Sequence, residues 1–94
     1  MIGKSIFKAG KLLKITLDYN EQDRTINSIK IEGDFFLHPE DGREKIEEGL
    51  KGTSLKKDQL IGRITNLITT NSLEVHGFTS EQLSEAIINA TVQA

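Results

Sequence analysis

The chain has 94 residues, of which 36% are hydrophobic and 28% charged, and its formal net charge is −2. This length and composition are typical of a single soluble globular domain, residues 1–94, and exclude an intrinsically disordered chain. The small negative charge does not favour binding to nucleic acid or to an anionic membrane.

Two absences narrow the chemistry further. The sequence has no cysteine, which excludes disulfides, thiolate metal sites and cysteine nucleophiles. No apolar run approaches the roughly 20 residues of a membrane span, and the first eight residues lack the apolar stretch of a signal peptide. We therefore expect a cytoplasmic protein without an active site of its own.

Alternation of apolar and polar residues predicts two strands in the first half of the chain. Residues 13–19 place hydrophobic side chains at every second position, and residues 29–35 repeat the pattern with Gly33 at one apolar position. The polar segment 20–24 between them is typical of a turn, so an antiparallel hairpin is predicted. Ile6 and Phe7 suggest a third strand at the edge.

The second half of the chain changes to helical periodicity. Pro39 suits the first turn of a helix, because its missing N–H has no partner to lose there. Gly49 and Gly52 would weaken and end this helix. Residues 60–68 carry an apolar stripe at helical spacing, and Asn71 is a candidate end for this second helix.

A third helix has the clearest start signal. Thr79 is predicted as its N-cap, and Gln82 three residues later completes a capping box. Strands followed by helices indicate an α+β fold. We expect a small antiparallel sheet of two to three strands, with three helices packed on one of its faces.

Acidic residues and a histidine form two incomplete ligand sets. Glu32 and Asp34 share one side of the predicted strand, and His38 stands near Glu40 and Asp41. The alternative is a solvated strand face, with Asp34 capping a turn and the other acids favouring a helix N-terminus. Because neither set is complete, we expect no bound metal and no catalytic residue in this chain.

Phe35 and Phe36 are the stronger indication of function. Consecutive side chains of an extended segment face opposite ways, so one ring can enter the core while the other needs different shelter. That shelter is either the following helix or another protein, since aromatic side chains are enriched at interface cores.

Several segments together resemble the C-terminal accessory domain of lipoate–protein ligases. The resemblance spans roughly residues 8–90, and Gly77 before the last helix also fits it. It is carried by GKLLK at 10–14, IKIEGDFF at 29–36, PED at 39–41, IE at 46–47 and LKG at 50–52. In this family the domain is either fused behind a large catalytic domain or is a separate small subunit. The separate form is expected here, and the accessory fold is similar to that of iron–sulfur scaffold proteins.

The resemblance also implies a reaction and a set of partners. Lipoate and ATP form lipoyl-AMP, and the lipoyl group then passes to a lysine of an acceptor domain. The family's catalytic residues lie in the large domain, so the complex would use ATP, Mg and lipoate, and this chain would bind none of them alone. The expected direct partner is the catalytic subunit, in a heterodimer, and the lipoyl acceptor domains are indirect partners.

The residues expected to contact the catalytic subunit are Gly33, Asp34, Phe35 and Phe36. One ring would anchor the contact, and Gly33 would let the backbone bend beside it. Two other interpretations stay open: a regulatory adaptor unrelated to lipoylation, and a metal-dependent enzyme using Glu32, Asp34 and His38.

Overall fold

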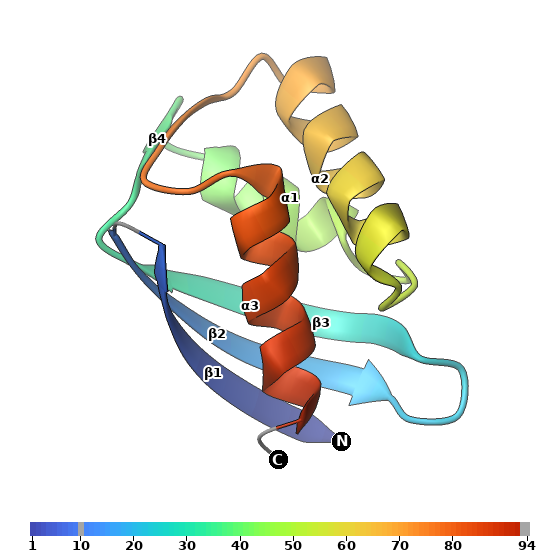
Figure 1. Ribbon diagram of the computed structural model, residues 1–94. Coiled ribbons are helices and arrows are strands. Elements are labelled where there is room, and N and C mark those ends of the chain that lie inside the picture. The colour runs from blue at the N-terminus through green and yellow to red at the C-terminus, as the bar shows by residue number, and fades with distance from the viewer. Residues whose placement is uncertain (10, 93–94) are drawn as a thin grey trace.

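A three-stranded antiparallel sheet forms one layer of the protein. The computed structural model describes residues 1–9 and 11–92 (Figure 1). The strand order is β1-β2-β3, with bounds β1 Ile2–Ala9, β2 Lys11–Asn20 and β3 Thr25–Gly33. The predicted hairpin and the predicted edge strand are both confirmed. Asn20 stabilises the hairpin turn, because its Oδ1 accepts hydrogen bonds from two backbone N–H groups of the turn at 2.9 and 3.0 Å.

Three helices form the second layer and lie on the same face of the sheet (Figure 1). Their bounds are α1 Gly42–Gly49, α2 Lys57–Thr70 and α3 Ser80–Val92. The other two strands, β4 Phe36–His38 and β5 Glu74–His76, pair antiparallel in a separate two-stranded ribbon. This arrangement confirms the predicted α+β fold.

The core lies between the sheet and the helices. Alternate positions of the long strands point into it and are fully buried in β2, as at Leu13, Ile15 and Leu17. The helices contribute further fully buried side chains: Ile46, Leu60, Ile64, Leu83, Ala86, Ile87 and Ala90. Burial of these apolar groups is the main force that holds the two layers together.

Helix α3 makes an unusually close approach to the edge strand β1. A Cβ atom at Gly3 would overlap with the carbonyl group of Ala90. Ser5, which is buried, donates a hydrogen bond from Oγ to the carbonyl oxygen of Ala86 at 2.6 Å. The small residues of β1 thus let the helix backbone pack directly on the strand.

The outer edge of β3 is covered by hydrogen bonds. The backbone N–H of Ile31 donates to the carboxylate of Glu47 in α1 at 2.8 Å. Further along the edge, Ile26 N–H donates to the carbonyl of Thr53, and Gly52 N–H donates to the carbonyl of Ile26, at 3.0 and 2.7 Å. An additional strand cannot form a regular ladder along this part of β3, because the Ile31 N–H and both backbone groups of Ile26 are already hydrogen-bonded.

The predicted ends of two helices agree with the structure. Thr79 and Gln82 form the capping box, since each side chain accepts a hydrogen bond from the other's backbone N–H at 3.1 and 2.9 Å. Asn71 is the C-cap of α2, and its side-chain nitrogen donates to the carbonyl of Leu67 at 2.9 Å.

Of the other predicted boundaries, two were wrong and one was partly right. The first helix begins at Gly42, not at Pro39, because Pro39 lies in a turn whose carbonyl accepts the Gly42 N–H at 2.9 Å. Helix α1 ends at Gly49, as predicted, whereas Gly52 lies beyond the helix, in the following turn with φ +82°. Strand β3 ends at Gly33, short of Phe35.

The order of elements also differs from the prediction, because β5 lies between two helices. Neither short strand, β4 or β5, was predicted. Gly10, which opens the first segment of the resemblance, lies outside the described residues.

Replacing Glu47 tests how much its hydrogen bond to the edge of β3 contributes to stability. Glu47→Ala leaves the partly buried Ile31 N–H without its acceptor. We therefore expect the free energy of unfolding to fall by about 1–3 kcal/mol. Urea denaturation measures the change. Glu48→Ala, which removes only an exposed carboxylate paired with Lys51 at 3.1 Å, should cost less than about 0.5 kcal/mol. Equal costs for the two variants would contradict a stabilising role for the Glu47 bond.

Candidate docking site

Gly33 ends the sheet at the start of the predicted interface segment. Its φ of +145° lies in a region that favours glycine, and a Cβ there would overlap with the carbonyl group of Leu12. The next residue, Asp34, donates its backbone N–H to the Leu12 carbonyl at 3.0 Å. Asp34 is exposed and lies beyond the end of β3. The prediction that it shares a strand face with Glu32 was therefore wrong.

The two adjacent phenylalanines take different environments, as predicted. Phe35 is half-buried and packs edge-on against Phe78, with ring centroids 5.3 Å apart and planes at 85°. Gly77, with φ +118°, lies so close that a Cβ there would come within 3.0 Å of Phe35. Phe36 is 61% exposed, which is unusual for a ring of this size.

The exposed ring belongs to one face of the β4–β5 ribbon. Phe36 lies opposite His76, and His38 lies opposite Glu74. Because opposed residues of an antiparallel pair project to the same side, these four exposed side chains share one face, which we call the aromatic ribbon face. Leu37 and Val75 occupy the other side and pack against the core.

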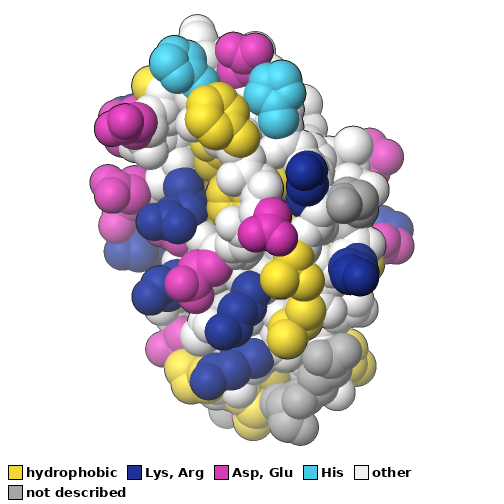
Figure 2. Space-filling view, turned by 90° about the vertical axis from the view of Figure 1, so that its left-hand side faces the viewer, with side chains coloured by type: hydrophobic (Ala, Val, Ile, Leu, Met, Phe, Trp, Pro, Cys, Tyr) yellow, Lys and Arg dark blue, Asp and Glu magenta, His cyan; other side chains and the backbone are white. Residues whose placement is uncertain are grey.

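Side chains of the aromatic ribbon face lie close to one another. The rings of Phe36 and His76 have centroids 6.1 Å apart, and His76 Nε2 lies 3.1 Å from Glu74 Oε1. Figure 2 shows the two histidine side chains on either side of a hydrophobic side chain. The two neighbouring rings together offer another protein an exposed aromatic surface.

The described residues contain no metal centre. No group of three or more His, Cys, Asp or Glu side chains among them is placed to hold an ion. The sets built on Glu32 with Asp34 and His38, or on His38 with Glu40 and Asp41, are therefore not assembled. Within the same residues, no helix is both long and apolar enough to cross a membrane.

Sequence reasoning missed the ribbon that supports the exposed ring. Its two strands have three residues each, in which a single apolar residue, Leu37 or Val75, stands between polar or exposed neighbours. That is too short for a periodic signal. The one available signal is Gly77, since a glycine just after a short apolar–polar alternation is typical of a tight backbone bend.

Comparison with known families identifies the chain. A family described as the bacterial lipoate protein ligase C-terminus matches residues 6–87. The chain belongs to this family. All four residues predicted for the interface, Gly33 to Phe36, lie within the matched range. The resemblance found in the sequence is thereby confirmed.

Two individual proteins extend this comparison. A relative named lipoate-protein ligase A subunit 2, from Thermoplasma acidophilum, is 42% identical over 52 residues, or 54% of this chain. The matched part spans 53% of that relative's length. A solved chain from the same organism aligns with TM-score 0.77 and 28% identity, over 93% of this chain and 94% of its own length. It comes from a study of an archaeal lipoylation system, a bi-partite lipoate protein ligase and its E2 lipoyl domain.

Truncating each phenylalanine separately tests their division between core and surface. Phe35→Ala removes the ring that packs on Phe78, and we expect it to destabilise the fold by about 2–3 kcal/mol. Phe36→Ala removes an exposed ring and should change stability by less than about 0.5 kcal/mol. Urea denaturation of both variants measures the difference. If Phe36→Ala proves the more costly change, the ring is structural and the docking assignment fails.

Proposed function

We propose that this chain is the smaller subunit of a two-chain lipoate–protein ligase in the cytoplasm, and that it acts without catalytic residues of its own. The larger chain would bind ATP, Mg and lipoate, and the two chains together would form lipoyl-AMP with release of pyrophosphate. The lipoyl group would then pass to a lysine of an acceptor domain, with release of AMP.

The alignment with the Thermoplasma acidophilum chain is the observation that carries this proposal. It covers 93% of this chain and 94% of the other, so the match extends over the whole domain and not over a fragment of it. The sequence match to a protein named as subunit 2 of a ligase supports the same assignment.

The described residues support an accessory role better than an independent reaction. They hold no cluster of acids and histidines suited to a metal, and no buried polar side-chain atom among them lacks a hydrogen-bond partner. Catalytic sites commonly contain polar or titratable groups whose hydrogen-bonding partner is the substrate. The exposed Phe36 is instead suited to burial against another protein.

The accessory chain would act by ordering and shielding the adenylation site. An acyl-adenylate is hydrolysed when water reaches it, and adenylation needs ordered loops around the nucleotide. A subunit docked beside those loops would stabilise their closed arrangement and keep water out. In this proposal the aromatic ribbon face supplies the anchor, with Phe36 entering a pocket of the larger chain.

Pyrophosphate exchange measures adenylate formation and so tests the proposal. We expect the larger chain alone to exchange pyrophosphate into ATP slowly in the presence of lipoate, and addition of this chain to raise the rate on the order of tenfold or more. Equal rates with and without the chain would reject the accessory role and favour a regulatory adaptor unrelated to lipoylation.

Phe36→Ala tests the anchor within that complex. Loss of a central aromatic anchor costs about 2 kcal/mol, so the dissociation constant should rise about thirtyfold while saturating amounts of the variant restore much of the activity. Val92→Ala is the matched control, because Val92 is an exposed apolar side chain, 76% accessible, near the C-terminal end of α3. Equal affinities of the two variants would place the contact elsewhere on the chain.

A further inference from the structure

The two edges of the main sheet differ. The edge at β3 is covered by Glu47 and by the loop around Thr53, whereas β1 has no neighbouring strand on its outer side within the described residues. The eight residues of β1 make it a long edge strand. Natural proteins cover or shorten such an edge or place lysines on it, and β1 carries Lys4 and Lys8, which disfavour pairing with a strand of like charge.

The hydrogen-bond pattern shows which backbone groups of β1 face outward. Met1 and Tyr19 exchange both backbone bonds, at 3.0 and 2.9 Å, so they are a hydrogen-bonded pair. In an antiparallel ladder such pairs alternate with pairs that exchange no bond. The register then directs the N–H and C=O groups of four residues away from β2: Ile2, Lys4, Ile6 and Lys8. Within residues 1–9 and 11–92, these groups bond to no other backbone segment.

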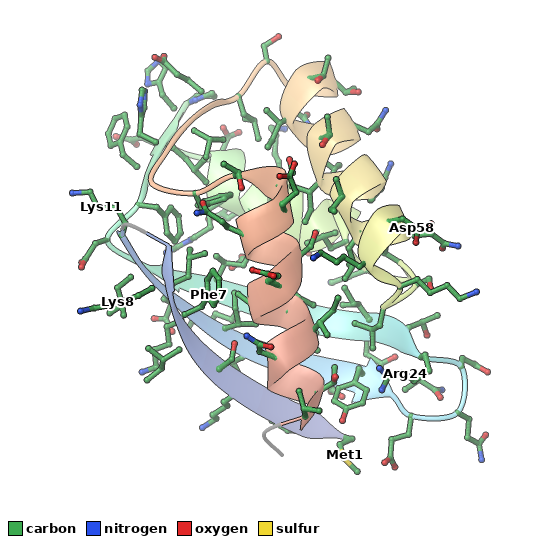
Figure 3. All side chains as sticks on the ribbon, in the orientation of Figure 1. Met1, Phe7, Lys8, Lys11, Arg24 and Asp58 are labelled. Carbon is green, nitrogen blue, oxygen red and sulfur yellow. The ribbon has the colours of Figure 1, made fainter. Side chains whose placement is uncertain are left out.

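The side chains of the same four residues lie on the open face of the sheet. Ile2 and Ile6 are 56% and 68% exposed, among the most exposed large hydrophobic side chains of the described chain. Figure 3 shows the alternation at the end of the strand, where Phe7 points toward α3 and Lys8 extends away from the protein. A strand added beside β1 would therefore gain backbone bonds and bury two isoleucines.

The positive charge of the open face favours an added strand that carries acidic side chains. Lysines outnumber acids on the open face, with Lys4, Lys8, Lys14 and Lys30 against Asp18 and Glu32. Asp18 already lies 3.6 Å from the N-terminal ammonium group. The chain as a whole has a net charge of −2, so this face is opposite in sign to the rest of the protein.

A second copy of this chain is a poor occupant. In the registers that pair most of two antiparallel β1 strands, Lys4 or Lys8 of one copy lies directly or diagonally across from a lysine of the other, and no carboxylate of β1 offsets the repulsion. An acidic strand avoids this. Figure 2 shows basic side chains, with acidic ones between them, and hydrophobic side chains on the same side of the protein as the histidines, so one partner can reach both regions.

We propose that the free edge of β1 accepts an extended segment of the larger ligase chain as a fourth strand, in which acidic side chains alternate with apolar ones along the exposed face. This inference rests on the proposed function for the identity of the partner. Backbone bonds to the four outward-facing residues would fix the segment, carboxylates would pair with Lys4 and Lys8, and apolar side chains would cover Ile2 and Ile6.

Amide hydrogen exchange in the complex of the two chains tests the added strand directly. Binding should slow exchange at least about tenfold at the outward-facing amides of Lys4, Ile6 and Lys8, since each gains a hydrogen bond. The amides of Gly3, Ser5 and Phe7 already bond to β2 and serve as internal controls. A complex that forms without slowing the outward-facing amides overturns the inference and leaves the proposed function standing.

Two variants test the same edge by affinity. Ile6→Pro removes one outward N–H, leaves the ladder to β2 intact and keeps Ser5 extended, so its dissociation constant should rise at least about fivefold. Ile6→Val keeps the N–H and should stay within about twofold. Unchanged affinity for a folded Ile6→Pro overturns the inference.

Reversing the charge of two lysines tests the same edge without any change to the backbone. The double variant Lys4→Glu with Lys8→Glu should bind about tenfold more weakly at low salt and lose most of that difference at high salt. Lys56→Glu, at the start of α2, is the control for charge reversal elsewhere. Equal binding of the double variant and the control overturns the inference, whereas absence of any complex with the unmodified chain rejects the proposed function and this inference with it.

Discussion

The close approach of Gly33 to the carbonyl of Leu12 determines where the sheet ends and how the two phenylalanines are directed. Only glycine fits there, because any Cβ would overlap with the neighbouring strand and the φ of +145° is unfavourable for other residues. The chain must therefore leave the sheet immediately before the two rings. Phe35 turns inward onto Phe78, so Phe36 is directed outward and stays exposed, which is why we propose it as the anchor for a partner.

How much of this could be predicted depends on the range of each signal. The hairpin strands and the capping box at Thr79 arise from local patterns, and both were predicted correctly. Pro39 was misplaced because proline suits a turn before a helix as well as a first helical turn, and only the bond from Gly42 distinguishes the two. The ribbon joins residues about 40 apart through strands of three residues each, which no local pattern reveals.

The candidate site was predictable in part for the same reason. The alternation of side chains along an extended segment predicts that Phe35 and Phe36 separate, but not which ring is buried. That choice is made by Phe78 and Gly77, which are distant in sequence and close in space. His76 and Glu74 reach the exposed ring through pairing with β4, so their place beside it also depends on a long-range contact.

An enzyme divided into two chains lacks the effective concentration that a linker provides, so its interface must supply the full affinity. Burying one phenylalanine contributes about 1.5–3 kcal/mol, whereas association costs at least about 4 kcal/mol in lost freedom of motion. Phe36 alone is therefore too small an anchor for a stable complex. In the proposed complex the edge of β1 would supply the missing part, because backbone bonds and two exposed isoleucines would add both specificity and buried area. A split ligase built on this fold would require the ring and the edge together.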